Sequence, residues 1–362
     1  MINGKQITNS SITQSKLSLI DPTSSLQAAT KQYVDNTIAG SIARTYYVSM
    51  TGSDSTGTGS TSRPFATIGK ALTQGAADVP LGGNAVGEGY FEVVIAAGKY
   101  TEDVSITRSK VILRGAGSET GRTQATQIYG NITVNPASAG SRFNSRICLS
   151  GLFVFAPTGK SYAVKLTGTQ EFGLDIDNCY LYMNSTANTP VLLTDNTNAN
   201  RCRINMVQTV CNCEKSGITL DIGGTLDFFA STQCSFQNST ASGTGALLKL
   251  SSSATALVDG SSFESVNTDA AIQLTGTMPG SYKIAFSNSL IQNSAGHGIE
   301  TTVSGMTIIM VRNIFQVVSG KSIIIVTAPA TGITYANSGN IAAYGTSSTK
   351  TGTVTSLAYV AV

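Results

Sequence analysis

Short apolar strands and polar turns alternate between about residues 146 and 326, in a repeat of roughly 27 residues. Each copy holds an apolar strand ending at a bulky anchor, a turn of Asn, Ser, Thr, Asp and Gly, and a second apolar strand. Apolar-x-apolar alternation indicates a strand, because successive side chains point to opposite faces. The anchors, spaced 25 to 29 residues apart, are Phe153, Leu181, Val210, Phe236, Phe263, Leu290 and Phe315.

The second strand of each copy keeps step with the first. These strands are Val164-Lys165-Leu166, Val191-Leu192-Leu193, Ile218-Thr219-Leu220, Leu248-Lys249-Leu250, Ile272-Gln273-Leu274 and residues 323–326. One copy cannot bury its apolar face alone, whereas stacked copies bury a continuous core. A copy of this length fits one turn of a parallel β-helix, while a propeller blade needs about 40–45 residues. The pattern therefore predicts an all-β fold, a parallel β-helix, and the general crossover rule makes it right-handed.

The first forty residues follow a different pattern. Apolar residues recur every five positions at Ile2, Ile7, Ile12 and Leu17, a period that fits neither a helix nor a strand. Residues 1–20 are therefore either an extended arm ordered against other chains, the interpretation we favour, or a frayed terminus. The capping-box pair Ser24 and Gln27 then predicts a short helix that ends at Gly40. Such a helix is marginal alone in water, so we expect self-association to support it.

Residues 21–35 carry a resemblance. The stretch Asp-Pro-Thr-Ser-Ser-Leu-Gln-Ala-Ala-Thr-Lys-Gln-Tyr-Val-Asp resembles a short N-terminal motif of many bacteriophage tail-fibre and virion-associated proteins, and its core at 28–35 is fairly specific. The resemblance implies that residues 1–44 attach the chain to other tail or baseplate proteins of a virion. It also implies a homotrimer.

An entry segment precedes the repeats. A strand is predicted at residues 46–49, and the Gly/Ser/Thr run after it predicts a loop. Pro64 then predicts the start of a helix, in which Phe65, Ile68 and Leu72 recur at helical spacing. An amphipathic helix here would cover the apolar core and open strand edges at the end of a solenoid. Residues 52–59 lack the Gly-Lys-Ser/Thr of a phosphate loop, so we interpret them as a turn.

A second resemblance covers roughly residues 45–326. The pieces Tyr-Val-Ser-Met-Thr-Gly-Ser-Asp (47–54), Pro-Phe-Ala-Thr-Ile (64–68) and Val-Ile-Ala-Ala-Gly-Lys-Tyr-Thr-Glu (94–102) look like the entry segment of pectate-lyase-like β-helix proteins. That family includes polysaccharide lyases, pectin esterases and phage tailspikes, so the resemblance implies the fold more than any activity. We expect a β-helix over residues 45–326 and a β-rich cap over 327–362.

Composition narrows the function classes. Charged residues make up 12% of the 362 residues, the net charge is +3, and no basic run points to nucleic acid. No apolar run is long enough to insert into a membrane, and no signal-peptide core precedes the arm. These features predict assembly in a cytoplasm. The resemblance of residues 21–35 implies that this is a host cytoplasm and that the final location is the phage tail.

Six cysteines offer two interpretations. Cys179 and Cys234 each precede an anchor by two residues, which favours buried core thiols. Cys202, Cys211 and Cys213 are the alternative, a metal site, but the CxxC spacing of structural zinc sites is missing. We therefore predict no metal and no cofactor.

Glycoside cleavage needs two carboxyl groups across a sugar, and lyases need a base with a cation. Asp175 and Asp177 are the best pair, because residues two apart on a strand share a face. Alignment of the anchors puts Ile204 and Met206 beside them on the next rung, so no acidic ladder forms. The other candidates are Asp221 with Asp227, Asp259 with Glu264, and Glu300 near His297.

Turn capping and solvated surface positions explain these carboxylates more simply than catalysis, and His297 reads as a turn residue. The chain has no Trp to serve as a sugar platform. We therefore assign no catalytic or ligand-binding residue. Three hypotheses remain: a structural virion protein of a tail fibre, tailspike or baseplate; a tailspike polysaccharide depolymerase with a cleft between subunits; and a non-enzymatic receptor for host surface glycan.

Overall fold

The structure, a computed structural model, describes fourteen segments of the chain. They are residues 42–79, 89–118, 125–137, 145–184, 189–195, 202–213, 219–223, 226–238, 244–251, 255–275, 283–303, 306–326, 334–344 and 356–359. The predicted arm over residues 1–20 and the predicted helix ending at Gly40 lie outside these segments, as does much of the predicted cap.

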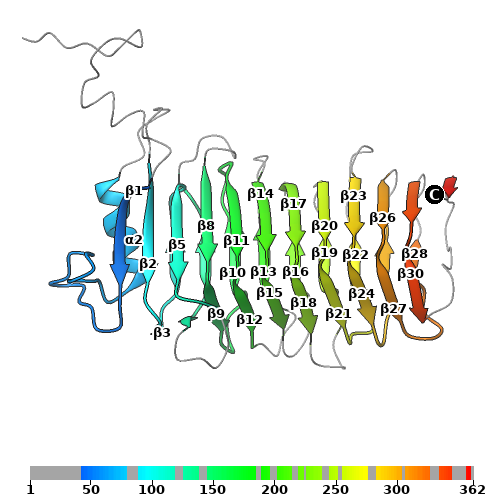
Figure 1. Ribbon diagram of the computed structural model, residues 1–362, viewed down its shortest axis with the longest axis horizontal. Helices are drawn as coiled ribbons and strands as arrows, with labels where there is room; N and C mark the ends of the chain where they lie inside the picture. Colours follow the sequence, from blue (N-terminus) through cyan, green and yellow to red (C-terminus); the bar gives the residue numbers. More distant parts are fainter. Residues whose placement is uncertain are drawn as a thin grey trace, which may run out of the picture.

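Three parallel sheets run along the molecule (Figure 1). The twelve-stranded sheet contains, in spatial order, β1 (Ile42–Val48), β2 (Tyr90–Ile95), β5 (Val111–Gly115), β8 (Arg146–Ser150), β11 (Gly173–Asp177), β14 (Cys202–Val207), β17 (Leu226–Thr232), β20 (Thr255–Asp259), β23 (Lys283–Ser287), β26 (Thr307–Val311), β29 (Thr334–Ser338) and β31 (Ser356–Tyr359). The ten-stranded sheet contains β3 (Gly98–Tyr100), β6 (Thr126–Tyr129), β9 (Leu152–Ala156), β12 (Tyr180–Met183), β15 (Val210–Cys213), β18 (Ser235–Asn238), β21 (Ser262–Ser265), β24 (Leu290–Asn293), β27 (Ile314–Val317) and β30 (Ile341–Tyr344).

The nine-stranded sheet contains β4 (Val104–Ile106), β7 (Ile132–Val134), β10 (Val164–Thr167), β13 (Leu192–Asp195), β16 (Leu220–Ile222), β19 (Leu248–Leu250), β22 (Ile272–Leu274), β25 (Ile299–Thr301) and β28 (Ile324–Val326). Each coil of the chain adds one strand to each sheet in turn, and neighbouring coils pair in parallel. The predicted parallel β-solenoid is confirmed. Its right-handedness and the domain limits at residues 44 and 326 stay predictions.

The register corrects the predicted anchors. The inward residues that stack in the ten-stranded sheet are Val154, Leu181, Cys211, Phe236, Phe263, Ile291 and Phe315. Phe153, Val210 and Leu290 were therefore wrong as anchors, because each lies one residue early and points outward. A one-residue slip reverses the face of every side chain in a strand. The slip arose because apolar residues occupy both faces at these points.

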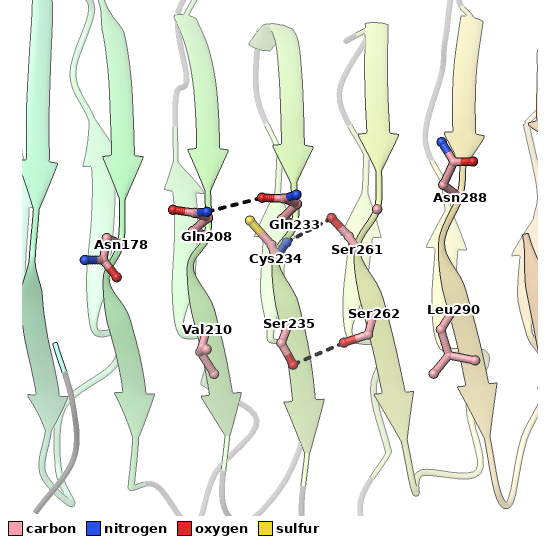
Figure 2. Close-up of a pocket in the computed structure, with 11 residues that line it drawn as sticks. Asn178, Gln208, Val210, Gln233, Cys234, Ser235, Ser261, Ser262, Asn288 and Leu290 are labelled. Carbon is pink, nitrogen blue, oxygen red and sulfur yellow. Dashed lines mark hydrogen bonds between the residues drawn. The ribbon is translucent and has the colours of Figure 1, made fainter.

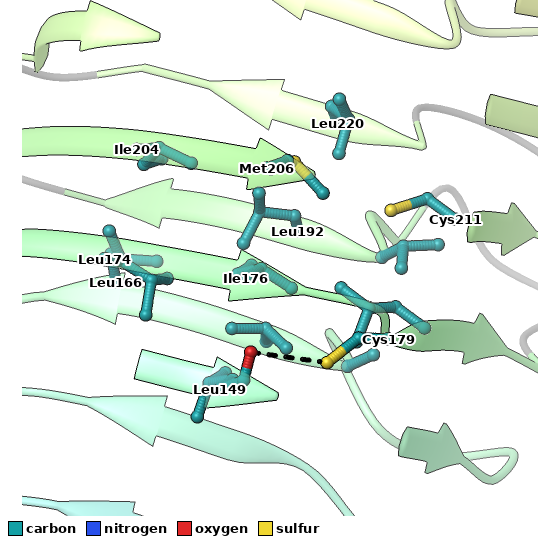
Figure 3. Packing of buried hydrophobic residues seen from close by; sticks show 14 of the residues in the cluster. Leu149, Leu166, Leu174, Ile176, Cys179, Leu192, Ile204, Met206, Cys211 and Leu220 are labelled. Carbon is teal, nitrogen blue, oxygen red and sulfur yellow. Dashed lines mark hydrogen bonds between the residues drawn. The ribbon is translucent and has the colours of Figure 1, made fainter. Parts of the chain in front are cut away.

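The core is a set of columns in which each side chain packs on its counterpart in the next coil. Figure 3 shows Leu174 beside Ile204 and Ile176 beside Met206, which are register partners in β11 and β14. Cys179 and Cys234 are 1% and 3% exposed, so the prediction of buried thiols is confirmed for both. Full burial of one aliphatic side chain, such as Leu174 or Ile204, contributes about 1.5–3 kcal/mol to the stability of the fold. The columns repeat that contribution in each coil.

The helix α2 (Ile68–Asp78) covers the end of the solenoid that β1 and β2 begin (Figure 1). It starts later than predicted, because Thr67 rather than Pro64 forms its N-cap and accepts a hydrogen bond from the amide of Lys70. Ile68, Ala71 and Leu72 form part of its buried face. The predicted covering helix is therefore confirmed.

Two carboxylates occupy the N-terminal end of α2. Asp54, from the loop at residues 52–59, accepts the amides of Ala66 and Thr67, and Glu102 accepts those of Ile68 and Gly69. A helix N-terminus attracts anions, so side-chain carboxylates here are stabilising. The loop at residues 52–59 thus supplies a carboxylate to the start of α2, which agrees with its interpretation as a turn.

The corner between the twelve-stranded and ten-stranded sheets repeats one backbone geometry. Eight successive coils place a residue with φ between +47° and +63° there: Gly151, Asn178, Gln208, Gln233, Gly260, Asn288, Arg312 and Gly339. In six of these coils the next residue is small or polar and buried, namely Cys179, Thr209, Cys234, Ser261, Ser289 and Asn313. In five of the six, its amide donates to the matching side chain of the next coil. The donor–acceptor pairs are Cys179–Thr209, Cys234–Ser261, Ser261–Ser289, Ser289–Asn313 and Asn313–Asn340. We call this row the corner ladder.

Candidate functional site

The best carboxylate pair from the sequence lies on the outer face of the twelve-stranded sheet. Asp175 forms an ion pair with Arg146 at 2.5 Å, and Asn205 donates to its other oxygen at 3.3 Å. Asp177 accepts a hydrogen bond from the Ser150 hydroxyl at 3.5 Å. The arrangement is that of a cross-coil ion pair flanked by hydrogen bonds.

The residues predicted beside this pair on the next coil were wrong. Asp175 pairs with Asn205 and Asp177 with Val207, whereas Ile204 and Met206 point into the core. The error follows from the same one-residue slip at the Val210 anchor. The conclusion that no acidic ladder forms on that coil still holds, because Asn205 and Val207 are not acidic.

The structure does not bring the second candidate pair together. Asp221 lies on the nine-stranded sheet, 3.8 Å from the ammonium group of Lys249, while Asp227 lies in β17 of the twelve-stranded sheet. Burial raises the pKa of Asp221, and the neighbouring Lys249 opposes that rise. Asp221 and Lys249 therefore form an ion pair across two coils.

Asp259 and Glu264 lie on different sheets, on either side of the corner. Asp259 accepts hydrogen bonds from Ser287 at 2.7 Å and Asn288 at 2.8 Å, and these bonds lower its pKa. It therefore helps to hold the corner turn of the following coil.

The last candidate pair is Glu300 with His297. Glu300 faces Gln273 across the nine-stranded sheet at 3.3 Å. His297 lies in the turn between β24 and β25, and its Nδ1 accepts the amide of Ser322 at 2.9 Å, which confirms its turn role. Within the described segments, no three His, Cys, Asp or Glu side chains gather as a metal site.

An aromatic stack on the outer face of the ten-stranded sheet was not predicted from the sequence. Tyr129 stacks on Phe155 at 4.6 Å between ring centroids, and Phe155 stacks on Tyr182 at 5.2 Å. The ammonium group of Lys99 lies 3.6 Å from the centroid of Tyr129. The faces of Phe155 are covered by Tyr129 and Tyr182, and Lys99 covers a face of Tyr129. The stack therefore stabilises the sheet and offers little flat ring surface to a sugar. Spacings of 26 and 27 residues were the available signal.

A second feature that the sequence did not reveal is a shallow groove along the corner, with a volume of about 580 Å³ (Figure 2). We call it the corner groove. One side carries the amide side chains of the left-handed residues, namely Asn178, Gln208, Gln233 and Asn288. The other side carries the first outward residue of each following strand, namely Val210, Ser235, Ser262 and Leu290. Cys234 and Ser261 of the corner ladder form its floor.

The polar groups of the corner groove are ordered by bonds between coils. Gln208 donates to Gln233 at 3.2 Å on one side, and Ser262 donates to Ser235 at 3.2 Å on the other (Figure 2). All the described side chains that line the groove are uncharged. The groove therefore offers rows of amide and hydroxyl groups, which both donate and accept hydrogen bonds. Beside this wall, the Asp259 carboxylate accepts a hydrogen bond from Asn288 at 2.8 Å.

No family model, curated protein or solved structure matches the chain. The fold itself defines the class of protein as a parallel β-solenoid, which is consistent with the expected pectate-lyase-like architecture. No helix in the described segments is long and apolar enough to cross a membrane.

Proposed function

We propose that this chain is a structural bacteriophage virion protein, part of a tail fibre, tailspike or baseplate spike, attached through residues 1–44. The observation that carries the proposal is the stack of parallel coils from β1 to β29, in which Asp175, Asp221 and Asp259 are tied into ion pairs and hydrogen bonds. The resemblance of residues 21–35 to virion-associated proteins supplies the location.

A stack of this kind is suited to a mechanical role. Each coil adds about 4.8 Å of length and pairs its backbone with both neighbours. The buried aliphatic columns and the hydrogen bonds of the corner ladder also join each coil to the next. Such a rod transmits force along its axis, because bending it requires many coupled contacts to shift together. We propose that three rods associate as a homotrimer, following the same resemblance.

The rival hypothesis of a depolymerase gives the first test. The full chain, first checked by sedimentation for a trimer of its 37.4 kDa subunit, is incubated with host-cell surface polysaccharide, and reducing ends are counted. We expect no release above a heat-denatured control. Release that disappears in Asp175→Asn/Asp177→Asn would establish an enzyme with those carboxylates as its machinery. Release that survives would establish an enzyme whose site lies elsewhere, and either result would contradict a purely structural role.

A further inference from the structure

We infer that the corner groove is a binding site for an uncharged saccharide chain lying along the solenoid axis. The inference rests on the proposed function in one respect: it would make the virion protein a receptor for host surface glycan. It depends on the groove at Gly260 and its amide and hydroxyl rows, and on no carboxylate.

The backbone at the corner favours glycine, and three of the eight coils use it. Side chains other than Gly, Asn and Asp are disfavoured at positive φ, because their Cβ atom crowds the backbone. Gln208 and Gln233 nevertheless occupy this position, at φ of 47° and 53°, on adjacent coils. Both side chains extend along the groove, where they bond to each other (Figure 2). Arg312 has the same conformation outside the groove, so the geometry belongs to the corner itself, and within the groove it places these two amides along one wall.

The shape of the groove depends on the coil at Gly260. Gln233 and Asn288 project from the coils on either side, and Gly260 interrupts the row of amides between them. A Cβ atom at Gly260 would meet the Gln233 side chain at 3.6 Å, an ordinary contact, so the position has space for a larger residue. The glycine therefore leaves open a space that a side chain can enter, at the cost of the strain that its φ of 56° imposes on any other residue.

The chemistry of the walls selects the ligand class. Primary amides and hydroxyls match the alternating donor and acceptor character of sugar hydroxyls. Without a cationic side chain the groove offers no ion pair to an anionic polymer. Val210 and Leu290 supply apolar surface towards its two ends, which suits the apolar faces of sugar rings. The coils repeat about every 4.8 Å, so a linear polymer would meet similar groups coil after coil.

The test uses the full-length protein on a printed array of neutral and acidic bacterial surface oligosaccharides, followed by calorimetric titration of the tightest neutral glycan. Gly260→Gln fills the groove with the side chain that Gln233 already carries at this backbone position. Gln233→Gly removes an amide and relieves the backbone. Gly339→Gln is the matched control, because Gly339 has the same corner conformation but lies outside the groove, and its nearest neighbour is the flexible Arg312 side chain at 3.3 Å.

We expect saturable binding of neutral glycans that weakens at least tenfold in both Gly260→Gln and Gln233→Gly and is unchanged in Gly339→Gln. The inference is overturned if the folded protein binds only acidic glycans, if it binds none, or if Gly260→Gln binds as well as the unaltered chain. None of these results decides whether the chain is part of a virion, which is established separately on purified particles.

Discussion

At the scale of single residues, the corner ladder is the feature that most constrains the chain. Asn313 is an example of how a ladder residue joins two coils. The Oδ1 of Asn313 accepts the amide of Ser289 at 3.0 Å, and the Nδ2 of Asn313 donates to the carbonyl of Phe286 at 2.9 Å. Its own amide donates to Asn340 at 2.7 Å. A buried polar group is costly unless it is hydrogen-bonded. The side chains of Thr209, Ser261, Ser289, Asn313 and Asn340 each accept a backbone amide of the preceding coil.

Asn313→Ala is therefore expected to destabilise the solenoid by about 1–3 kcal/mol, because it leaves the Ser289 amide and the Phe286 carbonyl without their buried partner. Urea unfolding followed by circular dichroism measures the change. Ser262→Ala is the control, since that hydroxyl lies on the outer face and its loss should change the free energy of unfolding by less than about 0.5 kcal/mol. Equal midpoints for the two variants would contradict a structural role for the ladder.

At the scale of elements, the sequence predicted the strands better than their register. Alternation identified both strands of each repeat, and Phe236, Phe263 and Phe315 were placed on the correct face. Phe153 was misplaced, because apolar residues stand on both sides of it and the pattern alone cannot choose between them. Only pairing with the neighbouring coil decides the face, and that information is not local.

The candidate site was harder to predict for a related reason. The corner groove is assembled from residues roughly 27 positions apart, and none of them belongs to a type with distinctive chemistry. Gln208 and Gln233 are ordinary polar residues in the sequence, and only the left-handed backbone places them in one row. The carboxylates were conspicuous in the sequence, yet the structure gives them partners such as Arg146 and Lys249.

We expect the stability of the α2 end of the solenoid to depend on pH through Asp54, whose carboxylate accepts the amides of Ala66 and Thr67. Burial alone would raise the pKa of this carboxyl group, but hydrogen bonds from Thr67 and Ala66 outweigh that effect and lower it below its usual value. A lowered folded pKa means that its stabilising contribution is present above the unfolded pKa of about 3.9 and is lost as pH falls through the folded value.

Asp54→Asn should accordingly lower the stability of the N-terminal end by about 1 kcal/mol at pH 7, as the loss of a capping carboxylate does. The difference between the variant and the unaltered chain should shrink as the pH is lowered below about 4. Hydrogen exchange of the α2 amides, measured at pH 7 and at low pH, reports this end of the molecule. A difference that persists undiminished at low pH would show that the ionised carboxylate is not the cause.

At the scale of the whole molecule, the chain has one geometry repeated along one axis. Among the described residues, α2 covers the end of the solenoid at which β1 begins (Figure 1). This polarity suits a spike held at one end. Because β1 starts at Ile42, removal of residues 1–41 leaves the first strand complete, so we expect the shortened chain to fold without the proposed attachment segment.

The central claim is attachment to a virion, and immunogold electron microscopy of purified particles tests it most directly. Particles lacking this chain are supplied with either the full chain or the chain without residues 1–41, and both are labelled with an antibody against the solenoid. We expect gold on the tails with the full chain and none with the shortened chain. Particles that carry no label from either chain, while both are folded in the lysate, would contradict a virion role.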